Sequence, residues 1–395
     1  LPVQKHLDGV IRIFVPAILF IASGTFLGWR FLTPDAGVNS AIIAAVSVLI
    51  IACPCALGLA TPTSILVGTG RAADLGVLFR RGDGLQLLAD VKAIALDKTG
   101  TLTVGRPSVT SLFQSHEHAS ELASLQSRST HPIAKAMEAM ARDSGATLME
   151  VQDFRAERGR GVMGSIDGVI WRIGSAAMMG EAGISVPDVT GLKAASLIYV
   201  AKGNDIVGVY AVHDEIHPKA PALINSLKQR GIEPVMITGD QNAAAQAVAD
   251  QLGISTFHAQ TLPADKANLV KALQQSHGIT AFLGDGVNDA PAMAQADVGI
   301  AIGTGSDIAI ESSDVVLVGG DPAGVLVAQK LAKATMAKIK QNLIWAFGYN
   351  VVLIPVAAGV MVPFGFGMLN PMLAGAAMAI SSICVVTNAL RLRRA

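Results

Sequence analysis

The hydrophobic residues of this chain form long runs near both ends and only short runs in the middle. A helix needs roughly 20 apolar residues to cross a bilayer. Four runs reach that length: 10–32, 41–70, 343–362 and 368–390. The last two contain no charged residue. The pattern therefore predicts four transmembrane α-helices, two on each side of a central region, because buried helices of a soluble protein fit these lengths poorly.

Basic residues lie on one side of the four predicted spans. The connections 33–40 and 363–367 contain no lysine or arginine, and only Arg30 lies near them. By the positive-inside rule, both termini and the central region are then cytoplasmic, in an integral membrane protein. The residues that set this orientation are Lys5, Arg12, Arg71, Arg80, Arg81, Lys333, Lys338, Lys340, Arg391, Arg393 and Arg394.

The central region alternates short apolar runs with helical stretches. This alternation predicts a parallel, doubly wound α/β sheet. Such sheets bind ligands at the carboxyl ends of their strands, so Asp97, Thr238, Gly239 and Asp285 are expected to converge in one crevice. The strand-like runs are 91–96, 234–240, 280–285, 298–302 and 315–318, and a helical pattern covers 243–252.

A segment with a different composition interrupts this alternation. Within 108–212, a helical pattern at 131–142 accompanies strand-like runs at 169–173 and 196–200. We expect an inserted α+β domain with a separate binding role. The predicted domains are two spans in 1–83, an α/β domain formed by 84–107 and 213–335, the insert 108–212, and two further spans in 336–395.

Composition narrows the class of protein. Of the 395 residues, 51% are hydrophobic and 15% are charged, whereas soluble domains contain about a quarter charged residues. Lysine plus arginine number 30 and are balanced by 30 acidic residues, so nothing indicates a nucleic-acid partner. The three cysteines, Cys53, Cys55 and Cys384, are too few for a disulfide framework.

The run Asp97-Lys98-Thr99-Gly100-Thr101 carries the first candidate chemistry. It follows an apolar run directly, which places the Asp97 carboxylate at a strand end. A carboxylate nucleophile there can form an aspartyl-phosphate. The backbone N–H groups and hydroxyls that follow are suited to holding a phosphoryl group. An ordinary turn could account for Asp97 alone, but the five-residue combination is much rarer.

Cys53-Pro54-Cys55 lies in the middle of the second predicted span. Reactive groups at membrane depth are functional by default. Two thiolates favour Cu(I), with Zn²⁺ as the main competitor, although free cysteines are also often simply buried. Pro54 and Pro62 are expected to break the helix and open its backbone around an ion. The third and fourth spans offer Tyr349, Asn350, Met378, Ser381 and Ser382 and no acidic residue, so charge balance favours Cu⁺ over Zn²⁺ and does not separate Ag⁺.

Four central segments together resemble the haloacid-dehalogenase-type phosphorylation core of P-type ATPases. They are 97–101, 238–240, Lys266 and 284–289. The resemblance implies that Asp97 attacks the γ-phosphate of ATP and that Lys266 supplies a fixed positive charge. Mg²⁺ would be held by Asp285 and Asp289, since it prefers one or two carboxylates with phosphate oxygens and water. The remaining residues of this predicted site are Lys98, Thr99, Thr238, Gly239 and Asp240.

The polar residues of the spans resemble those of the copper-transporting branch of heavy-metal P-type ATPases. The resemblance implies ATP-driven export of Cu(I), aided by a cytoplasmic copper chaperone, across a bacterial inner membrane. The predicted copper ligands are Cys53, Cys55, Tyr349, Asn350, Met378 and Ser382.

The insert resembles the nucleotide-binding domain of the same family. His131-Pro132 and Gly159-Arg160-Gly161 match its His-Pro and Gly-x-Gly elements, although a lone histidine before a proline at a helix start is more often just a neighbour of the helix cap. Gln126 replaces the usual Glu, and Ser175 replaces the usual Asn. The predicted ATP contacts are Gln126, His131, Gly159, Gly161 and Ser175.

The family's Thr-Gly-Glu actuator signature does not occur in the sequence. We therefore expect the carboxy-terminal part of a copper pump, without the actuator domain or the earlier helices. A membrane-anchored phosphatase is the enzymatic alternative, but such phosphatases usually have an acid where this chain has Thr99. A non-catalytic metal-binding membrane fragment is the third possibility.

Overall fold

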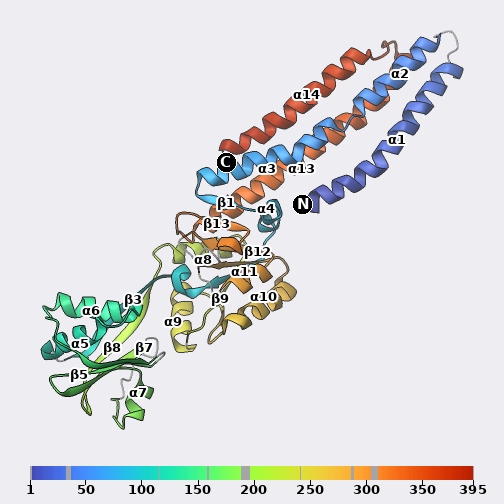
Figure 1. The fold of residues 1–395 in the computed structure, drawn as a ribbon. Coiled ribbons are helices and arrows are strands. Elements are labelled where there is room, and N and C mark those ends of the chain that lie inside the picture. The colour runs from blue at the N-terminus through green and yellow to red at the C-terminus, as the bar shows by residue number, and fades with distance from the viewer. Residues whose placement is uncertain are drawn as a thin grey trace. The chain divides into compact units, whose positions relative to one another are not determined.

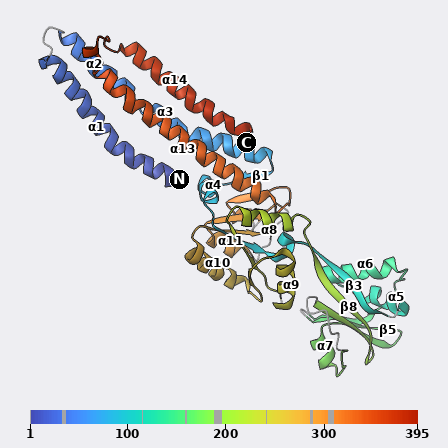
Figure 2. The same ribbon diagram turned by 180° about the vertical axis from the view of Figure 1, so that it is seen from behind.

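The computed structural model describes residues 2–32, 37–114, 116–157, 160–187, 196–240, 242–285, 289–303 and 310–394. Two compact units divide the chain (Figures 1 and 2). The first unit comprises 1–91, 313–320 and 324–395, and the second comprises 92–312 and 321–323.

Long helices dominate the first unit. Both views show them running alongside one another. Close to them in the sequence, the short strands β1 (Val77–Phe79) and β13 (Val315–Leu317) pair antiparallel. The helices are α1 (Pro2–Leu32), α2 (Gly37–Ile51), α3 (Cys55–Asp74), α4 (Gly82–Ala89), α13 (Gly324–Ala357) and α14 (Pro371–Leu390), with 3₁₀ turns at Val362–Phe364 and Arg391–Arg394.

Three helical stretches among the described residues are long and apolar enough to cross a membrane, rather than the four predicted. They are Ile11–Phe31, Gly37–Asp74 and Pro371–Arg394. The predicted span 343–362 is not among them, because its helix α13 begins at Gly324 and ends at Ala357, before the apolar run is complete. Lysines occupy the preceding turns of α13 up to Lys340, which dilutes its hydropathy.

The second predicted span is two helices. The chain leaves helical geometry between the end of α2 at Ile51 and the start of α3 at Cys55, so the Cys-Pro-Cys run lies at the break. Pro54 is the N-cap of α3, as expected for a helix-breaking residue. The expected second break at Pro62 is wrong, because Pro62 lies inside the continuous helix α3. Neighbouring helices make such a proline tolerable in an apolar bundle.

A parallel sheet forms the first part of the second unit. Within this unit its strands lie in the order β12–β11–β2–β9–β10, and each of these neighbouring pairs is parallel. Strand β2 is buried along its whole length, as continuous apolar runs in parallel sheets are. The strands are β2 (Ala93–Asp97), β9 (Glu233–Ile237), β10 (Thr256–His258), β11 (Thr280–Gly284) and β12 (Val298–Ile302), with helices α8 (Ala220–Gln229), α9 (Asn242–Leu252), α10 (Pro263–His277) and α11 (Ala290–Gln295).

An antiparallel sheet forms the rest of the second unit. Its order is β3–β8–β7–β6–β5–β4, and its core includes the fully buried Trp171 and Met137. The strands β3 and β8 run through the predicted boundaries at 107/108 and 212/213, so those domain limits stay a prediction. The elements are β3 (Thr103–Gln114), β4 (Gln152–Glu157), β5 (Gly161–Ile166), β6 (Val169–Gly174), β7 (Ser196–Lys202), β8 (Asp205–Ile216), α5 (Ala119–Gln126), α6 (Pro132–Asp143) and α7 (Ala176–Glu181).

Candidate functional site

Asp97 is the last residue of β2, and it lies between the parallel neighbours β11 and β9. The residue is 7% exposed. The tight turn 98–102 follows, and Gly100 adopts a φ of 71° in it. A Cβ at Gly100 would lie 1.9 Å from Asp285 Oδ2. Only glycine permits this close approach of the turn to a second carboxylate.

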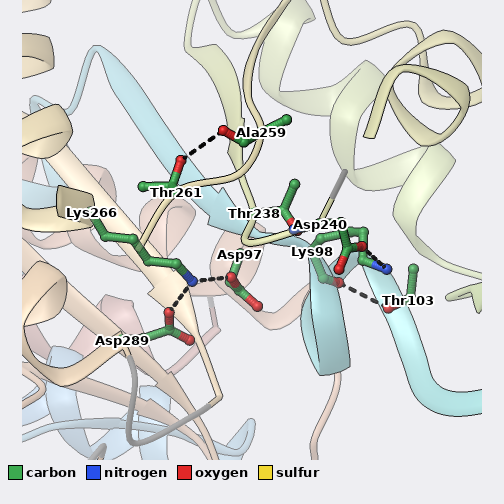
Figure 3. A network of polar contacts seen from close by, with 9 residues as sticks. All are labelled: Asp97, Lys98, Thr103, Thr238, Asp240, Ala259, Thr261, Lys266 and Asp289. Carbon is green, nitrogen blue, oxygen red and sulfur yellow. Dashed lines mark hydrogen bonds and ion pairs between the residues drawn. The ribbon is translucent and has the colours of Figure 1, made fainter. Parts of the chain in front are cut away.

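Lys266 ties two carboxylates together at this strand end (Figure 3). Its Nζ donates to Asp97 Oδ1 at 2.5 Å and to Asp289 Oδ1 at 2.7 Å. Lys266 comes from the first turn of α10, and Asp289 is the residue directly before α11. All three side chains are buried, so these are charge-assisted bonds in a low-dielectric environment.

Asp97, Asp285 and Asp289 can place one oxygen each within 4.8 Å of one another. Burial, and then the charge of Asp289, raises the pKa of Asp97 to about 7 against the opposing pull of Lys266. Burial, and then Asp289, raises the pKa of Asp285 to about 6. Burial by itself lowers the pKa of Lys266, but the charges of Asp97 and Asp289 outweigh it and the pKa is raised.

These shifts describe a cluster with excess negative charge. Three carboxylates face one lysine, so ionising all three is costly without another cation. A small divalent ion with a preference for oxygen would relieve that cost. The donor set therefore fits Mg²⁺.

The predicted phosphate-holding turn lies at the end of the neighbouring strand β9. Thr238 is buried, and its Oγ1 accepts a hydrogen bond from the Asp240 N–H at 3.2 Å. The Asp240 carboxylate pairs with Lys98 Nζ at 2.6 Å. The structure thus brings the 97–101 and 238–240 runs together through a salt bridge, while Thr99 is exposed.

Asp214 and Thr103 belong to the same network and were not predicted. Thr103 Oγ1 lies 2.6 Å from Asp214 Oδ2 and 3.0 Å from the Lys98 carbonyl oxygen. Asp214 Oδ2 lies 3.9 Å from Lys98 Nζ. Asp214 lies on β8, which pairs with β3. Thr103 and Asp214 are 111 positions apart in the sequence. No local pattern in the sequence indicates such a pairing.

The predicted nucleotide contacts differ in burial and in hydrogen-bond partners. Gln126 is buried, and its Nε2 donates to Met137 Sδ at 3.3 Å, so its side chain packs in the core. His131 is exposed and caps α6, with its Nδ1 accepting from the Ile133 N–H at 3.2 Å. Its roles as a cap and as an ATP contact remain compatible.

Gly161 and Ser175 are brought together by the pairing of β5 with β6. Gly161 lies opposite Gly174, and a Cβ on Gly161 would come within 2.2 Å of the Ile173 carbonyl oxygen. Ser175 caps α7 and accepts from the Met178 N–H at 3.4 Å. Gly159 lies outside the described residues.

The predicted copper ligands lie on α13, on α14 and at the α2–α3 break. Asn350 and Met378 are buried, and Tyr349 is half-buried. Ser382 Oγ donates to the Met378 carbonyl oxygen at 3.2 Å. Cys53 is half-buried. The Cys55 side chain lies outside the described part of the structure.

Comparison with known proteins identifies the family. The haloacid dehalogenase-like hydrolase family matches residues 91–297. "Copper-transporting ATPase 1" of Rhizobium meliloti is 49% identical over 404 residues, covering 100% of this chain and 49% of that protein. "Copper-exporting P-type ATPase" of Legionella pneumophila is 45% identical, covering 100% of this chain and 55% of that protein. The chain therefore spans about half the length of these relatives.

Solved structures agree with this fold. A zinc-transporting PIB-type ATPase in its E2.Pi state superposes with a TM-score of 0.82 at 33% identity, covering 98% of this chain and 64% of that one. The catalytic domain of the CPx-ATPase CopB-B superposes with a TM-score of 0.58 at 28% identity, covering 66% of this chain and 98% of that one. The predicted resemblance is confirmed: the chain belongs to the haloacid dehalogenase-like hydrolase family and is a homologue of copper-transporting P-type ATPases.

Proposed function

We propose that this chain is the phosphorylation and ion-pathway part of an ATP-driven exporter of Cu(I). The observation that carries the proposal is the buried cluster in which Lys266 bridges Asp97 and Asp289 at the carboxyl ends of parallel strands. Phosphoryl transfer depends on positioning and charge neutralisation more than on covalent chemistry. A nucleophilic carboxylate held between a lysine and a cation site meets both needs.

The reaction assigns each residue a task. A carboxylate oxygen of Asp97 attacks the γ-phosphorus of ATP, and the bond to the bridging oxygen breaks, so that ADP leaves with the electron pair. The Lys266 ammonium holds the Asp97 carboxylate, and the Thr238 hydroxyl and the Gly239 N–H would hold phosphoryl oxygens. Asp285 and Asp289, with Asp97, would hold Mg²⁺, which when bound neutralises the approaching phosphate.

The product is a persistent aspartyl-phosphate. Position 99 holds an exposed threonine, which has no pKa useful for general acid–base chemistry near neutral pH. A phosphoenzyme without that acid loses its phosphoryl group slowly. This favours a transporter, which needs a lasting intermediate, over a membrane-anchored phosphatase.

The proposed cargo is Cu(I), with Ag(I) chemically equivalent. Cys53 and Cys55 are soft ligands, and Met378 adds a thioether. The runs 343–362 and 368–390 contain no acidic residue, so a divalent ion would leave more charge uncompensated in lipid. The curated relatives are named for copper, whereas the solved structure that superposes on 98% of this chain is of a zinc transporter, so the metal must be tested directly.

The family and the charge pattern together suggest a membrane location, an orientation, a protein partner and a nucleotide-binding region. We propose a bacterial inner-membrane location, with both termini and the central region cytoplasmic. Cu(I) would arrive from a cytoplasmic copper chaperone. ATP would bind in the antiparallel sheet domain near His131, Gly161 and Ser175, and no nucleic acid is involved.

Labelling with γ-radiolabelled ATP tests the phosphoenzyme. With Mg²⁺ present, the unmutated chain should acquire acid-stable, hydroxylamine-sensitive label. Asp97→Asn should abolish it, because an amide oxygen is a far poorer nucleophile than a carboxylate. Asp265→Asn changes an exposed acid one residue from Lys266 and serves as the matched control. Undiminished label in Asp97→Asn would place the nucleophile elsewhere.

A further inference from the structure

A chain of hydrogen bonds links α13, α14 and α3 within the first unit. Lys338 Nζ donates to Asn388 Oδ1 at 3.1 Å, and Asn388 Nδ2 donates to Asn342 Oδ1 at 2.8 Å. Asn342 Nδ2 then donates to Ser64 Oγ at 3.2 Å. Ser64 Oγ donates to the Ala60 carbonyl oxygen at 2.7 Å. Every bond runs in the same direction, from an ammonium group to a backbone carbonyl of the helix that begins at Cys55.

The burial of this chain makes it costly unless it is complete. Asn342 and Ser64 have no solvent exposure. A buried amide left without partners costs about 1–3 kcal/mol, whereas apolar residues of the same shape would be nearly neutral. Stability alone therefore does not explain the network. A polar network inside a helix bundle, with every hydrogen bond satisfied, fixes one alignment of the helices.

In this alignment α3 and α13 are antiparallel. A second contact, between Gly68 and Thr335, agrees with it. A Cβ on Gly68 would lie 2.3 Å from Thr335 Oγ1, so the two backbones approach closely there. Ser64 precedes Gly68 on α3, whereas its partner Asn342 follows Thr335 on α13. The two helices therefore run in opposite directions. Small residues permit this approach in membrane helices.

The same register leads to the proposed copper site. An apolar layer lies next to Ser64 and Asn342, toward the start of α3 and the end of α13. Beyond this layer, Asn350 is the next buried polar residue of α13. On α14, the half-buried Asn388 is followed toward the start of the helix by the buried residues Val385, Ser381 and Met378. The apolar layer consists of Ala56, Leu57, Ala60, Ala346 and Val385.

We propose that Asn342, Asn388 and Ser64 are positioning residues for the Cu(I) site. They hold α3 on α13 and α14 in the register that brings the Cys-Pro-Cys end of α3 level with Asn350 and Met378. Because α13 is one unbroken helix from Gly324 to Ala357, a displacement of α13 is passed to α3 at this point. The inference rests on the proposed Cu(I) site and names residues that do not touch the ion.

The test is Cu(I) affinity in the full chain, reduced and reconstituted in lipid nanodiscs, measured by competition with bicinchoninate. Asn342→Leu keeps the volume and removes both amide bonds. We expect its affinity to fall on the order of tenfold, through loss of one or two buried hydrogen bonds. Ser64→Ala removes the bond between α3 and α13 together with the local bond to the Ala60 carbonyl oxygen, and its Cu(I) affinity should fall about threefold. Asn39→Leu changes an exposed asparagine of α2 and serves as the matched control, with unchanged affinity.

A swap separates positioning from bulk stability. Ser64→Asn combined with Asn342→Ser restores an amide–hydroxyl bond between α3 and α13, so it should recover most of the affinity that Asn342→Leu loses. Unchanged affinity in both Asn342→Leu and Ser64→Ala, or no recovery in the swap, would overturn the positioning role. Failure of the proposed function is visible separately: the unmutated chain would then bind no Cu(I), and the positioning role would fall with it.

Discussion

The crevice of the parallel sheet and the interior of the helix bundle handle polar groups in opposite ways. In the crevice, Lys266 Nζ forms ion pairs with Asp97 Oδ1 at 2.5 Å and with Asp289 Oδ1 at 2.7 Å. In the bundle, the buried polar groups are neutral amides, hydroxyls and sulfur atoms. A cluster of carboxylates selects a hard ion and a phosphoryl group, whereas neutral and sulfur ligands select a soft monovalent ion.

The difference teaches how the proposed Mg²⁺ and Cu(I) sites would each select their own ion. Mg²⁺ gains little from thiolates and Cu(I) gains little from carboxylates, so selectivity follows from donor type without any barrier between the sites. Changes in one region should therefore leave metal binding in the other intact.

The largest expected effect is in the bundle. Replacing both Cys53 and Cys55 by Ser exchanges soft thiolates for hard hydroxyls, so Cu(I) affinity should fall by more than about a hundredfold. Competition with bicinchoninate measures it, and Mg²⁺ binding should be unchanged. Cys384→Ser removes an exposed free cysteine of α14 and is the matched control. Retained affinity in the double variant would remove the Cys-Pro-Cys run from the site.

The crevice should respond nearly as strongly to loss of its lysine. Lys266→Met leaves Asp97 and Asp289 facing each other without their shared cation, and breaking a buried ion pair in this way costs about 3–5 kcal/mol. The initial rate of phosphoenzyme formation should fall by about a hundredfold or more. Lys271→Met, an exposed change on the same helix α10, should not alter the rate. Equal rates in the two variants would contradict the role given to Lys266.

A smaller effect is expected from pH on Mg²⁺ binding. Mg²⁺ needs ionised ligands, and the raised pKa values of Asp97, about 7, and Asp285, about 6, keep protons on these groups at mildly acidic pH. Affinity should be full near pH 8 and fall at least about tenfold by pH 5.5, as the protons return to the two carboxylates. Calorimetric titration measures the trend. Asp285→Asn should flatten it, and a pH-independent affinity in the unmutated chain would contradict the assignment.

Much of the crevice could be predicted because its signals are local. Asp97 ends a continuous apolar run, and Asp285 follows another, so strand-end positions could be assigned from the run lengths alone. Asp214 and Thr103 could not be assigned, because an antiparallel pairing of distant strands brings Asp214 to Lys98. Gln126 was matched by sequence position, which says nothing about the core packing of its side chain against Met137.

The bundle was predicted less completely, since hydropathy does not report helix ends or registers. The break at Cys-Pro-Cys was expected, but the continuous helix through Pro62 depends on its packing against neighbouring helices. The run 343–362 is not among the candidate spans of the described residues, because α13 begins well before this apolar run and ends inside it. The link between Ser64 and Asn342 joins residues 278 positions apart, and no periodicity in the sequence specifies it.

X-ray absorption at the copper edge tests the separation of the two sites most directly. The reduced chain is loaded with Cu(I) in the presence of Mg²⁺, and the same is done for the Cys53→Ser/Cys55→Ser and Asp285→Asn variants. The account predicts sulfur neighbours in the unmutated chain, lost in the cysteine variant and unchanged in Asp285→Asn. A shell of oxygen or nitrogen that survives loss of the cysteines and changes in Asp285→Asn would place copper in the crevice and contradict the account.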